Sequence, residues 1–473
     1  MYIPTIGLEI HVELKTHTKM FCGCKNDPYE TRPNTNVCPI CLAHPGVLPT
    51  MNEEAIKSVV KVGYALESKI ADHSHFDRKS YFYPDLPKGY QISQYEEPLV
   101  EGGMLKGVRI TRVHLEEDTG TLGHDKEGMS LVDYNRAGVP LMELVTEPDI
   151  HTPEEAVAFG KALQRILRYL GVSDANMEQG QMRVEANISV RKEEGEGFGT
   201  KVEVKNLNSF RAVEGAIRYE LKRQEEALER GEKVVQETRG WDEKKQITIS
   251  QRSKESAHDY RYFPEPDLPP LDLTKWNREE IKNLLPELPE AKYHRFINEF
   301  GCTPAQAEIL TEDKSVADYF ENAVSEFQEK KENASCSTLI NYYLNDLLGL
   351  LKEKKITISE SKITPEHFAH FVALIDEGKL LSRLAKDLLK QMADTGEDPE
   401  TLLEQSGVQV IGDENTLKLI VEEIIGVHPK VVEDYKKGKT SALQFLVGQG
   451  MAKTKGQADP SVLRALFEKL LTD

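Results

Sequence analysis

The sequence predicts an α+β fold in which a strand-rich N-terminal half precedes an all-helical C-terminal region. Short β-like runs alternate with a few helices over about the first 260 of the 473 residues. Six prolines then fall between Pro264 and Pro289, a density that excludes a continuous helix or a central strand. Beyond them the pattern is helical nearly to the end, so we expect the main domain boundary in this proline-rich segment.

Apolar periodicity predicts the elements of the N-terminal half in order. The predicted strands are residues 6–14, 108–115, 184–190 and 202–204. Residues 153–170 form a predicted helix, because its apolar residues recur at helical spacing and a proline and two glutamates occupy its first turn. A second helix is predicted over residues 212–230, and Gly171 and Gly231 suit the two helix ends.

The C-terminal region changes character twice along its length. A short segment of different composition begins at Gly407, and from Pro429 onward the charge changes sign. Residues 430–473 hold eight Lys or Arg and five Asp or Glu, which is 8 − 5 = +3. We therefore predict three domains, at residues 1–290, 291–407 and 408–473, of which the last is a small helical tail.

Composition excludes several classes of protein. The 60 basic and 79 acidic residues give a net charge of −19, which argues against a nonspecific nucleic-acid binder that relies on many phosphate contacts. No apolar run approaches the ~18 residues needed to span a bilayer, and Glu9, His11 and Glu13 interrupt the stretch where a signal peptide would be apolar. We expect a cytoplasmic chain with no membrane partner and a local basic patch.

The first predicted strand alternates apolar and polar side chains. With a period of two residues, Glu9, His11 and Glu13 face one side and the leucine, isoleucine and valine residues between them face the other. Taken alone, this face is most simply a solvated surface. Further carboxylates in β-like runs, at 116–118 and at Glu143, make a cation site the alternative, because such groups are costly unless paired or bound to cations. Oxygen ligands with one imidazole suit Mg²⁺ or Mn²⁺. Mg²⁺ held by protein carboxylates usually also holds substrate phosphates, which points towards ATP.

Four of the six cysteines crowd into a short segment. They read Cys22-Gly23-Cys24 and, after thirteen residues, Cys38-Pro39-Ile40-Cys41. In a reducing compartment, two close pairs of thiols favour a tetrahedral Zn²⁺ site over disulfides. The site would be structural, because four protein ligands leave no position for substrate. The alternative is a set of buried or stray thiols.

Residues 76–94 interleave basic and aromatic side chains. Such a pattern can pair with phosphates and stack on a base, although the aromatic residues can equally serve as packing. The candidates for binding are Arg78, Lys79, Tyr81, Lys88 and Tyr90. A second patch of this kind follows at residues 259–263.

Several nucleotide-binding and hydrolase motifs are missing. Gly438-Lys439-Thr440 resembles the end of a P-loop, but Glu433 stands where that motif requires glycine. We find no dinucleotide-binding glycine motif and no nucleophile elbow of the GxSxG type. If ATP is bound, the nucleotide site is therefore neither a P-loop nor a dinucleotide fold.

Long motifs along the chain resemble those of one family, the B subunits of the tRNA-dependent amidotransferases. The resemblance covers essentially the whole chain. The motifs that carry it are residues 7–14, 76–94, 114–118, 133–138, 146–149, 205–210, 236–239, 259–267 and 445–449.

The resemblance implies a fold and an activity. It implies an N-terminal cradle similar to glutamine synthetase, with a mainly antiparallel sheet and flanking helices. It implies a heterotrimer in which an A subunit releases ammonia from glutamine and a small C subunit wraps both. The B subunit would phosphorylate the side chain of Glu-tRNA(Gln) or Asp-tRNA(Asn) with ATP, and ammonia would then displace phosphate.

The resemblance also assigns candidate roles to residues. Mg²⁺ would be held by residues from the set Glu9, His11, Glu116, Glu117 and Glu143. Strand alternation separates Glu116 from Glu117 and leaves open which of them is the ligand; the set Glu9, His11, Glu117 and Glu143 is one form of the site. The segment 76–94 would bind phosphates and the terminal adenosine. The tail would bind the tRNA body through Lys436, Lys437, Lys439, Lys453 and Lys455.

A nonenzymatic interpretation competes with this one. In it the chain is a zinc-braced tRNA-binding adaptor whose carboxylates are only structural, and ATP dependence distinguishes the two. The choice between Glu-tRNA and Asp-tRNA, and the path of ammonia, stay open.

Overall fold

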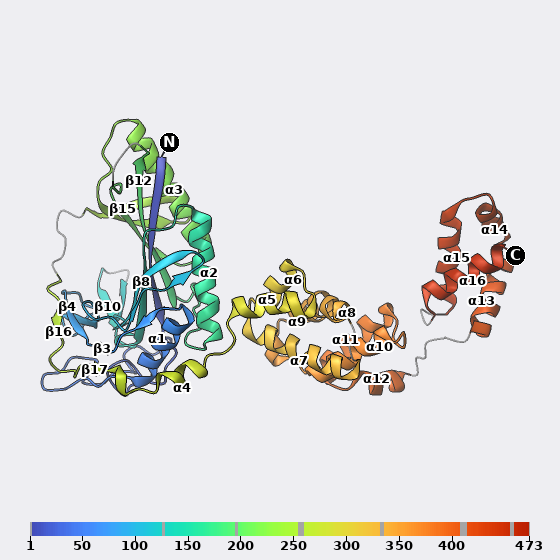
Figure 1. The fold of residues 1–473 in the computed structure, drawn as a ribbon, viewed down its shortest axis with the longest axis horizontal. Coiled ribbons are helices and arrows are strands. Elements are labelled where there is room, and N and C mark those ends of the chain that lie inside the picture. Colours follow the sequence, from blue (N-terminus) through green and yellow to red (C-terminus); the bar gives the residue numbers. More distant parts are fainter. Residues whose placement is uncertain are drawn as a thin grey trace. The chain divides into compact units, whose positions relative to one another are not determined.

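The chain folds into two compact units, residues 1–288 and 289–473 (Figure 1). The computed structural model describes residues 2–124, 128–193, 197–253, 260–331, 335–406, 414–454 and 458–472. The first unit is a large sheet with helices, and the second is helical throughout the residues described. This confirms the predicted α+β class and the order of its two parts.

Within the described residues, a ten-stranded sheet forms the frame of the first unit, in the order β15-β14-β13-β12-β1-β11-β8-β6-β2 with β7 paired to β8. Neighbouring strands are antiparallel, except β13 and β14, which are parallel. The predicted strands correspond to β1, β8, β12 and β13. The strands are β1 (Tyr2–Glu13), β2 (Lys69–Ile70), β6 (Val100–Glu101), β7 (Met104–Leu105), β8 (Val108–Glu117), β11 (Pro140–Thr146), β12 (Met182–Lys192), β13 (Val202–Leu207), β14 (Glu237–Asp242) and β15 (Ile247–Ser253).

The apolar face of the sheet is covered by helices. Leu8, Ile10 and Val12 of β1 are buried in the same hydrophobic cluster as residues of the helices, such as Leu163. Figure 1 shows two of these helices running along one side of the sheet. Burial of this face removes large apolar side chains from water, each worth about 1.5–3 kcal/mol. The helices are α1 (Glu53–Ala65), α2 (Pro153–Tyr169), α3 (Phe210–Glu229) and α4 (Arg278–Asn283).

The predicted start of the helix at residue 153 is confirmed by its cap. Thr152 accepts a hydrogen bond from the backbone of Glu155, whose side chain accepts one from the backbone of Thr152, and Pro153 occupies the first turn. This reciprocal pair satisfies two of the backbone N–H groups that a helix start leaves without partners. The second predicted helix begins two residues earlier than expected, after the Ser209 cap of α3.

Among the described residues of the first unit, three small sheets accompany the large one. They are β9 (Thr121–His124) with β10 (Ser130–Asp133), β3 (His73–Ser74) with β17 (Leu271–Asp272), and β4 (Asp77–Ser80) between β5 (Tyr90–Ser93) and β16 (Phe263–Pro264); a 3-10 turn, Leu273–Lys275, follows β17. The Ser93 hydroxyl of β5 donates to Glu116, and the backbone of Ile92 donates to Glu117. The basic and aromatic segment is thereby attached to the end of β8.

The second unit is built from short helices, several of which start with a threonine cap followed by proline. One aromatic cluster packs Phe296, Phe320, Tyr343 and Phe368 together. The helices are α5 (Pro289–Phe300), α6 (Pro304–Leu310), α7 (Lys314–Lys330), α8 (Ser337–Asn341), α9 (Leu348–Lys354), α10 (Pro365–Asp376), α11 (Ser382–Thr395) and α12 (Pro399–Ser406), with a π-helical turn, Tyr342–Leu347, before α9 and a 3-10 turn, Ile358–Glu360, after it.

The last four helices share a hydrophobic cluster of their own. Leu417, Leu446 and Phe467 are among its fully buried members. These helices are α13 (Glu414–Val427), α14 (Pro429–Lys436), α15 (Thr440–Lys453) and α16 (Pro460–Thr472). The predicted segment 407–412 lies outside the described residues, and the division into three domains at residues 290 and 407 stays a prediction.

Candidate active site

The polar face of β1 meets polar side chains of both neighbouring strands. His11 lies opposite Glu143 of β11 and opposite Arg183 of β12, and Glu143 in turn lies opposite His114 of β8. Residues that are directly opposite on adjacent antiparallel strands share one face of the sheet. The registers of four strands therefore bring His11 together with ionisable groups that are more than 100 residues away in the sequence.

Three of the predicted residues form a group that we call the His–Glu cluster, namely His11, Glu116 and Glu143. One ligand atom of each lies within 4.8 Å of the others. His11 Nε2 is 3.7 Å from Glu116 Oε1 and 3.6 Å from Glu143 Oε2. The Ser93 hydroxyl donates to the other oxygen of Glu116 at 3.0 Å. Two carboxylates and an imidazole at these separations can share one cation.

His114 supports the His–Glu cluster from inside the protein. Its Nε2 lies 3.1 Å from Glu143 Oε2 and 3.9 Å from Glu116 Oε2, and its side chain is only 3% exposed. With a hydrogen on Nε2, the imidazole donates to Glu143. Its buried Nδ1 has no hydrogen-bond partner among the residues described. His114 therefore orients Glu143 and is not itself exposed to substrate.

Lys79 of β4 faces the His–Glu cluster. Burial would lower the pKa of this ammonium, but the charges of Glu116 and Glu143 raise it above its ordinary value, so Lys79 stays charged. Burial would likewise raise the pKa of Glu143, but the imidazoles of His114 and His11 and the charge of Lys79 hold it well below its usual range. Opposite charges at close range favour the ionised form of each group.

Tyrosine rings surround Lys79. Its Nζ lies 5.2 Å from the ring centroid of Tyr260, which packs edge-on against Tyr81 and Tyr262. Between the two tyrosines, Arg261 adopts a left-handed conformation with φ of 46°, which a side chain other than glycine rarely takes and which recurs at functional sites. Burial raises the pKa of Tyr262 to about 12, so the hydroxyl of Tyr262 stays protonated.

Glu9 lies outside the His–Glu cluster and belongs to a second group, the acid cluster, with Glu185 and Glu203. One oxygen of each lies within 4.8 Å of the others. Asn187 donates to Glu9 at 2.8 Å, and Lys205 Nζ lies 3.1 Å from Glu185 and 3.5 Å from Glu203. Burial, with the charges of Glu143 and Glu185, raises the pKa of Glu9. The two clusters are therefore neighbours along β1, and the charge of Glu143 in one of them raises the pKa of Glu9 in the other.

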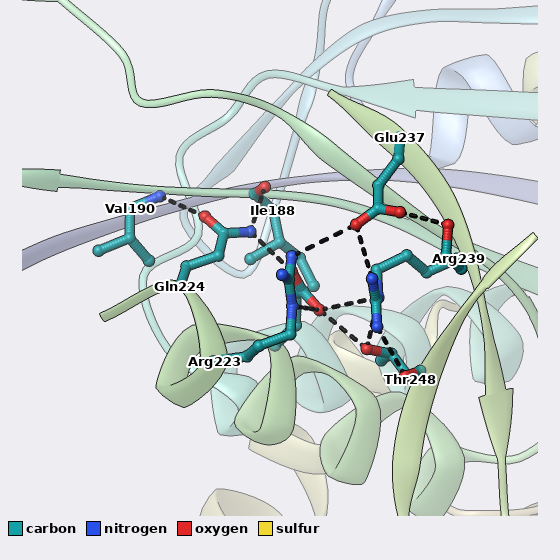
Figure 2. A network of polar contacts seen from close by, with 9 residues as sticks. Ile188, Val190, Arg223, Gln224, Glu237, Arg239 and Thr248 are labelled. Carbon is teal, nitrogen blue, oxygen red and sulfur yellow. Dashed lines mark hydrogen bonds and ion pairs between the residues drawn. The ribbon is translucent and has the colours of Figure 1, made fainter. Parts of the chain in front are cut away.

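A buried network lies behind the strands that carry the acid cluster (Figure 2). Glu220 of α3 is fully buried and accepts hydrogen bonds from Arg223, Gln224 and Thr248. Arg239 of β14 approaches Glu220 to 3.6 Å and donates to the Thr248 hydroxyl and backbone. Figure 2 shows Gln224 also reaching the backbone of β12. The carboxylate of Glu220 thus ties the helix to β14 and β15, and Gln224 ties it to β12.

The network extends to the acid cluster through Thr238, the residue that precedes Arg239 in β14. The Thr238 hydroxyl donates to Glu203 at 2.7 Å, and Thr238 lies opposite Glu203 in the parallel pair of β13 and β14. Successive side chains of a strand point to opposite faces, so Arg239 is anchored in the network while Thr238 reaches Glu203. The network therefore holds β14 in position, and β14 in turn positions Glu203 through Thr238.

Glu117 is not brought to the His–Glu cluster. Lys88 Nζ lies 2.7 Å from Glu117 Oε2, and the backbone of Ile92 donates to Glu117 Oε1 at 3.0 Å. The strand places Glu116 on the polar face with His114 and sends Glu117 to the other side. The sequence left open whether Glu116 or Glu117 lies with the other candidate ligands. In the structure, Glu116 is the one that lies with His11 and Glu143.

Arg78 and Tyr90 lie beside this Lys88–Glu117 pair. The Arg78 guanidinium makes a two-pronged ion pair with Glu265, with both distances at 2.7 Å, and a further one with Asp267 at 3.1 Å. It stacks over the Tyr90 ring at 4.4 Å. Both carboxylates compete with a phosphate for this guanidinium, so Arg78 fits a structural role under Tyr90 better than the predicted phosphate contact.

At the far end of β1, Glu13 lies among a third set of polar groups. It accepts a hydrogen bond from the Tyr29 hydroxyl at 3.0 Å. Burial, followed by the charge of Asp118, raises the pKa of Glu13 to about 7. Arg183 pairs with Asp118 at 2.6 Å, so the polar face continues without interruption from the acid cluster to this end of the strand.

The four N-terminal cysteines converge as their spacing predicted. The Sγ atoms of Cys22, Cys24, Cys38 and Cys41 lie within 4.8 Å of one another, and all four are free thiols. Cys38 and Cys41 have their sulfur atoms 3.9 Å apart. A tetrahedral Zn²⁺ with bonds of about 2.3 Å separates its sulfur ligands by about 3.8 Å, so the donor set fits zinc.

A buried lysine adjoins this cysteine group. Lys19 has no exposed surface and donates to the backbone oxygen of Tyr134 at 3.1 Å. Hydrogen bonding by Cys22, and also the charge of Lys19, lowers the pKa of the Cys41 thiol to about 5. A lysine in this position offsets part of the negative charge that four thiolates would carry.

Four of the five predicted tRNA-binding lysines are described, and they lie on or beside α14 and α15. Lys436 is exposed, whereas Lys437 pairs with Glu433 at 2.7 Å and Lys439 with Asp434 at 2.9 Å. Lys453 pairs with Glu423. Lys455 lies outside the described residues. The ion pairs of Lys437 and Lys439 are exposed, and such pairs are weak, so these lysines can exchange their partners for phosphates.

Sequence reasoning missed several members of the site. Glu185 and Glu203 stand between apolar residues in strands that were predicted, so the alternation that singled out Glu9 would also have singled them out. No local feature of the sequence indicates that these two residues lie close to Glu9. His114 was visible in a motif but had no assigned role, because its burial depends on the packing of β8.

The helices of the described segments include none that is both long and apolar enough to cross a membrane. Two family models match the chain: the GatB/GatE catalytic domain over residues 4–279 and the GatB domain over residues 318–471. These matches cover the sheet unit with both clusters and most of the helical unit.

Curated relatives align over nearly the full length. The B subunit of the aspartyl/glutamyl-tRNA(Asn/Gln) amidotransferase from Carboxydothermus hydrogenoformans is 46% identical over 482 residues, covering 99% of each chain. The proteins of the same name from Thermotoga maritima and Persephonella marina are 48% and 47% identical, again over 99% of each chain. The chain therefore belongs to the GatB family of amidotransferase B subunits.

Proposed function

We propose that this chain phosphorylates the side-chain carboxylate of a misacylated Glu-tRNA(Gln) or Asp-tRNA(Asn) with ATP and then directs its amidation. The family supports the reaction, since relatives at 46–48% identity are named as B subunits of the aspartyl/glutamyl-tRNA(Asn/Gln) amidotransferase. The observation that carries the proposal is the His–Glu cluster facing the charged Lys79. Cation ligands and an ammonium converge there on one accessible polar face.

The donor set of the His–Glu cluster fits Mg²⁺. Glu116 and Glu143 offer hard oxygen ligands and His11 one imidazole, a combination that suits Mg²⁺ with waters and phosphates completing its coordination. When bound, Mg²⁺ would neutralise charge on the transferred phosphoryl group. The low pKa of Glu143 keeps this ligand ionised without a cation.

The acid cluster is the second candidate for a cation in this proposal. Glu9 and His11 are two residues apart on the same face of β1, so about 7 Å separates their positions along the strand. ATP carries several phosphates, and two cation sites at this spacing can hold successive ones. Asn187 and Lys205 orient the carboxylates of the acid cluster and limit their mutual repulsion.

The protein's own groups divide the remaining work. Lys79 is charged and faces the cluster, so it can hold an oxygen of the phosphoryl group as the substrate carboxylate attacks and ADP leaves. Ammonia then attacks the acyl carbon and inorganic phosphate departs. An acyl phosphate is hydrolysed readily in water, and the rings of Tyr81, Tyr260 and Tyr262 lie where they would shield it.

The proposal includes partners and an internal brace. An amidase A subunit would supply ammonia and a small C subunit would complete a cytoplasmic heterotrimer, because no glutaminase motif is found in this sequence. Cys22, Cys24, Cys38 and Cys41 would hold a structural Zn²⁺. The last four helices would bind the tRNA body through their exposed lysines.

Reconstitution tests the proposal. The chain is assembled with its A and C subunits and given ATP and Glu-tRNA(Gln) or Asp-tRNA(Asn), once with glutamine and once without. We expect amidation with glutamine and an acid-labile phosphorylated aminoacyl-tRNA without it. Comparing the two tRNAs identifies the substrate.

Matched variants test the role of the cluster. Glu143→Gln should reduce amidation by at least about 100-fold, since it removes a charged ligand from the reacting centre. Glu147→Gln is the control, because Glu147 follows β11 and contacts Thr111 outside the cluster. Full activity of Glu143→Gln, or amidation that does not need ATP, would support the adaptor interpretation instead.

A further inference from the structure

One row of directly opposed residues crosses six strands of the large sheet. Residues that are directly opposite on adjacent strands share one face of the sheet, and this row lies on the polar face. The row consists of Lys69 of β2, Glu101 of β6, Arg112 of β8, Val145 of β11, Glu9 of β1 and Glu185 of β12. Glu9 and Glu185 belong to the acid cluster. Arg112 therefore shares a face with that cluster, two strand spacings or about 10 Å from Glu9.

Arg112 is also close to the His–Glu cluster along its own strand. His114 and Glu116 follow it at intervals of two residues, and the two residues between them are fully buried on the other face. The register of β8 and β11 shifts directly after the pair of Arg112 and Val145. Such irregularities are over-represented next to active sites, where they change the direction of a side chain. Arg112 thus lies beside both candidate cation sites.

The guanidinium of Arg112 makes no ion pair with a described residue. Its Nε is buried and has no hydrogen-bond partner in the part of the chain that the structure describes. Glu101, directly opposite on one side, lies 3.5 Å from Lys69 instead, and Val145 on the other side offers no polar side chain. A buried donor without an acceptor is costly, so an anionic ligand would compensate this arginine.

An aromatic wall holds the guanidinium beside the clusters. Arg112 Cζ lies 6.0 Å from the ring centroid of Tyr95, and Tyr95 stacks on Tyr262 with 4.4 Å between centroids and 12° between planes. Tyr262 packs edge-on against Tyr260, over which Lys79 lies. The wall therefore has a cationic side chain at each end, Arg112 at one and Lys79 at the other.

A phosphate suits the guanidinium in shape and charge. The planar fork of N–H donors matches two oxygens of one phosphate, and arginine retains its charge when it is partly buried. A phosphate held by cations at the two clusters would lie on the same face as Arg112. The arginine would then neutralise charge on the phosphates from β8, while Lys79 does so from the opposite end of the wall.

We propose that Arg112 binds a phosphate of ATP during phosphoryl transfer. The inference rests on the proposed function, in which the phosphates of ATP lie over the two clusters. In that reaction a carboxylate oxygen of the substrate forms a bond to the γ-phosphorus. The bond from this phosphorus to the bridging oxygen breaks, and its electron pair stays on the β-phosphate of ADP. Arg112 would stabilise the negative charge that the phosphates carry in this step.

Neutral and charge-retaining variants test this inference in the assembled complex. Arg112→Gln removes the charge, and Arg112→Lys keeps a charge without the planar fork. Arg109→Gln is the matched control, because Arg109 lies on the same strand, is 62% exposed and pairs with Asp149 outside both clusters. Glutaminase activity and the melting temperature of each complex show whether it is folded and assembled.

We expect kcat/KM for ATP to fall by about 10–100-fold in Arg112→Gln, the effect of losing a hydrogen bond to a charged group, and to fall less in Arg112→Lys. The KM for aminoacyl-tRNA at saturating ATP should stay within about twofold of wild type. Mn²⁺ binding by the chain without ATP should not weaken in Arg112→Gln, because loss of a positive charge beside two cation sites reduces repulsion. A residue that only braced the sheet would not affect ATP alone.

Three results would overturn the inference. The first is an unchanged kcat/KM for ATP in Arg112→Gln. The second is a higher KM for aminoacyl-tRNA with no change for ATP, which would assign the arginine to a phosphate of the tRNA. The third is weaker Mn²⁺ binding in Arg112→Gln or an equal loss of activity in Arg109→Gln, which would indicate a structural effect. Failure of the proposed function would differ from all three, because the wild-type complex would then lack ATP-dependent amidation.

Discussion

Glu116 and Glu117 are consecutive residues with different surroundings. Glu116 faces His11 and Glu143 across the sheet, while Glu117 is held by Lys88 and the backbone of Ile92. The difference arises because the side chains of a strand alternate between its two faces. A cation at the His–Glu cluster should therefore depend on one of these two carboxylates only.

Manganese binding measures this difference. Glu116→Gln should weaken Mn²⁺ binding at the cluster by roughly 100-fold, because a charged ligand is lost, while Glu117→Gln should leave it unchanged. Electron paramagnetic resonance of Mn²⁺ titrated into the chain reports the free ion directly. Equal weakening in both variants would contradict the assignment.

His114 should increase the affinity of the cluster for its cation without binding the cation itself. Its imidazole donates to Glu143 and is buried, and loss of such an orienting partner typically costs 10–100-fold in metal affinity. His114→Phe should therefore weaken Mn²⁺ binding by about that factor, and His114→Gln should restore part of it, since an amide can still donate. A His114→Phe chain with wild-type affinity would show that Glu143 needs no support.

At the scale of elements, the Glu220 network joins α3 to β12, β14 and β15. The carboxylate is completely buried and receives Arg223 and the approach of Arg239. Removing one partner of a buried ion pair leaves the others uncompensated, at a cost of about 3–5 kcal/mol. The network thus makes the position of β14, and with it Thr238 and Glu203, depend on the helix.

Glu220→Ala should lower the free energy of unfolding by about 3–5 kcal/mol. Glu226→Ala on the same helix is the control, because its exposed carboxylate pairs only loosely with Lys222 at 3.9 Å and should cost under about 1 kcal/mol. Denaturant unfolding of the first unit, followed by the fluorescence of its two tryptophans, Trp241 in β14 and Trp276, measures both. Similar losses in the two variants would contradict the role of the network.

The four-cysteine loop is the second element whose stability is testable. Cys24→Ser should abolish binding of one zinc per chain and lower the melting temperature of the sheet unit, because metal binding contributes directly to the folding of such sites. Cys302→Ser in the helical unit is the control, since this buried thiol lies outside the group. Metal analysis and calorimetry measure the two effects. Zinc retained at one per chain by Cys24→Ser would rule out the four-thiolate site.

At the scale of the molecule, charge is distributed unevenly. The chain carries −19 overall, while residues 430–473 carry +3. Five carboxylates gather at the two clusters, where cations are expected, and Lys436, Lys437 and Lys439 lie on or beside α14. A negative total therefore excludes indiscriminate binding of nucleic acid and leaves room for binding at one helical surface.

Deleting residues 408–473 should raise the KM for tRNA by at least about tenfold and leave glutaminase activity of the complex within about twofold, because phosphate contacts contribute much of the affinity. Replacing Lys436, Lys437 and Lys439 by Glu should also raise the KM for tRNA, and the KM should then depend less on salt concentration. Equal loss of both activities on deletion would contradict a separate tRNA-binding role.

The fold was predictable where its signals are local. The start of α2 at Pro153, the alternation of β1 and the spacing of the cysteines are all contained in stretches of about twenty residues, and each is observed where it was expected. The cluster to which Glu9 belongs was not predictable: Glu9 lies with Glu185 on the adjacent strand and Glu203 on the strand beyond it, rather than with His11. The partner of Arg78, Glu265, is likewise 187 residues distant.

The sequence by itself determined which residues face which side of each strand, where helices begin, and the family to which the chain belongs. Only the tertiary structure decided which polar residues meet. The reason is physical: periodicity and capping depend on neighbours along the chain, whereas the register between β1, β8 and β11 is selected by burial of a shared apolar face. A shift of the strand register by one residue would have placed the side chain of His11 in the core. The His–Glu cluster is thus a consequence of long-range packing acting on locally predictable strands.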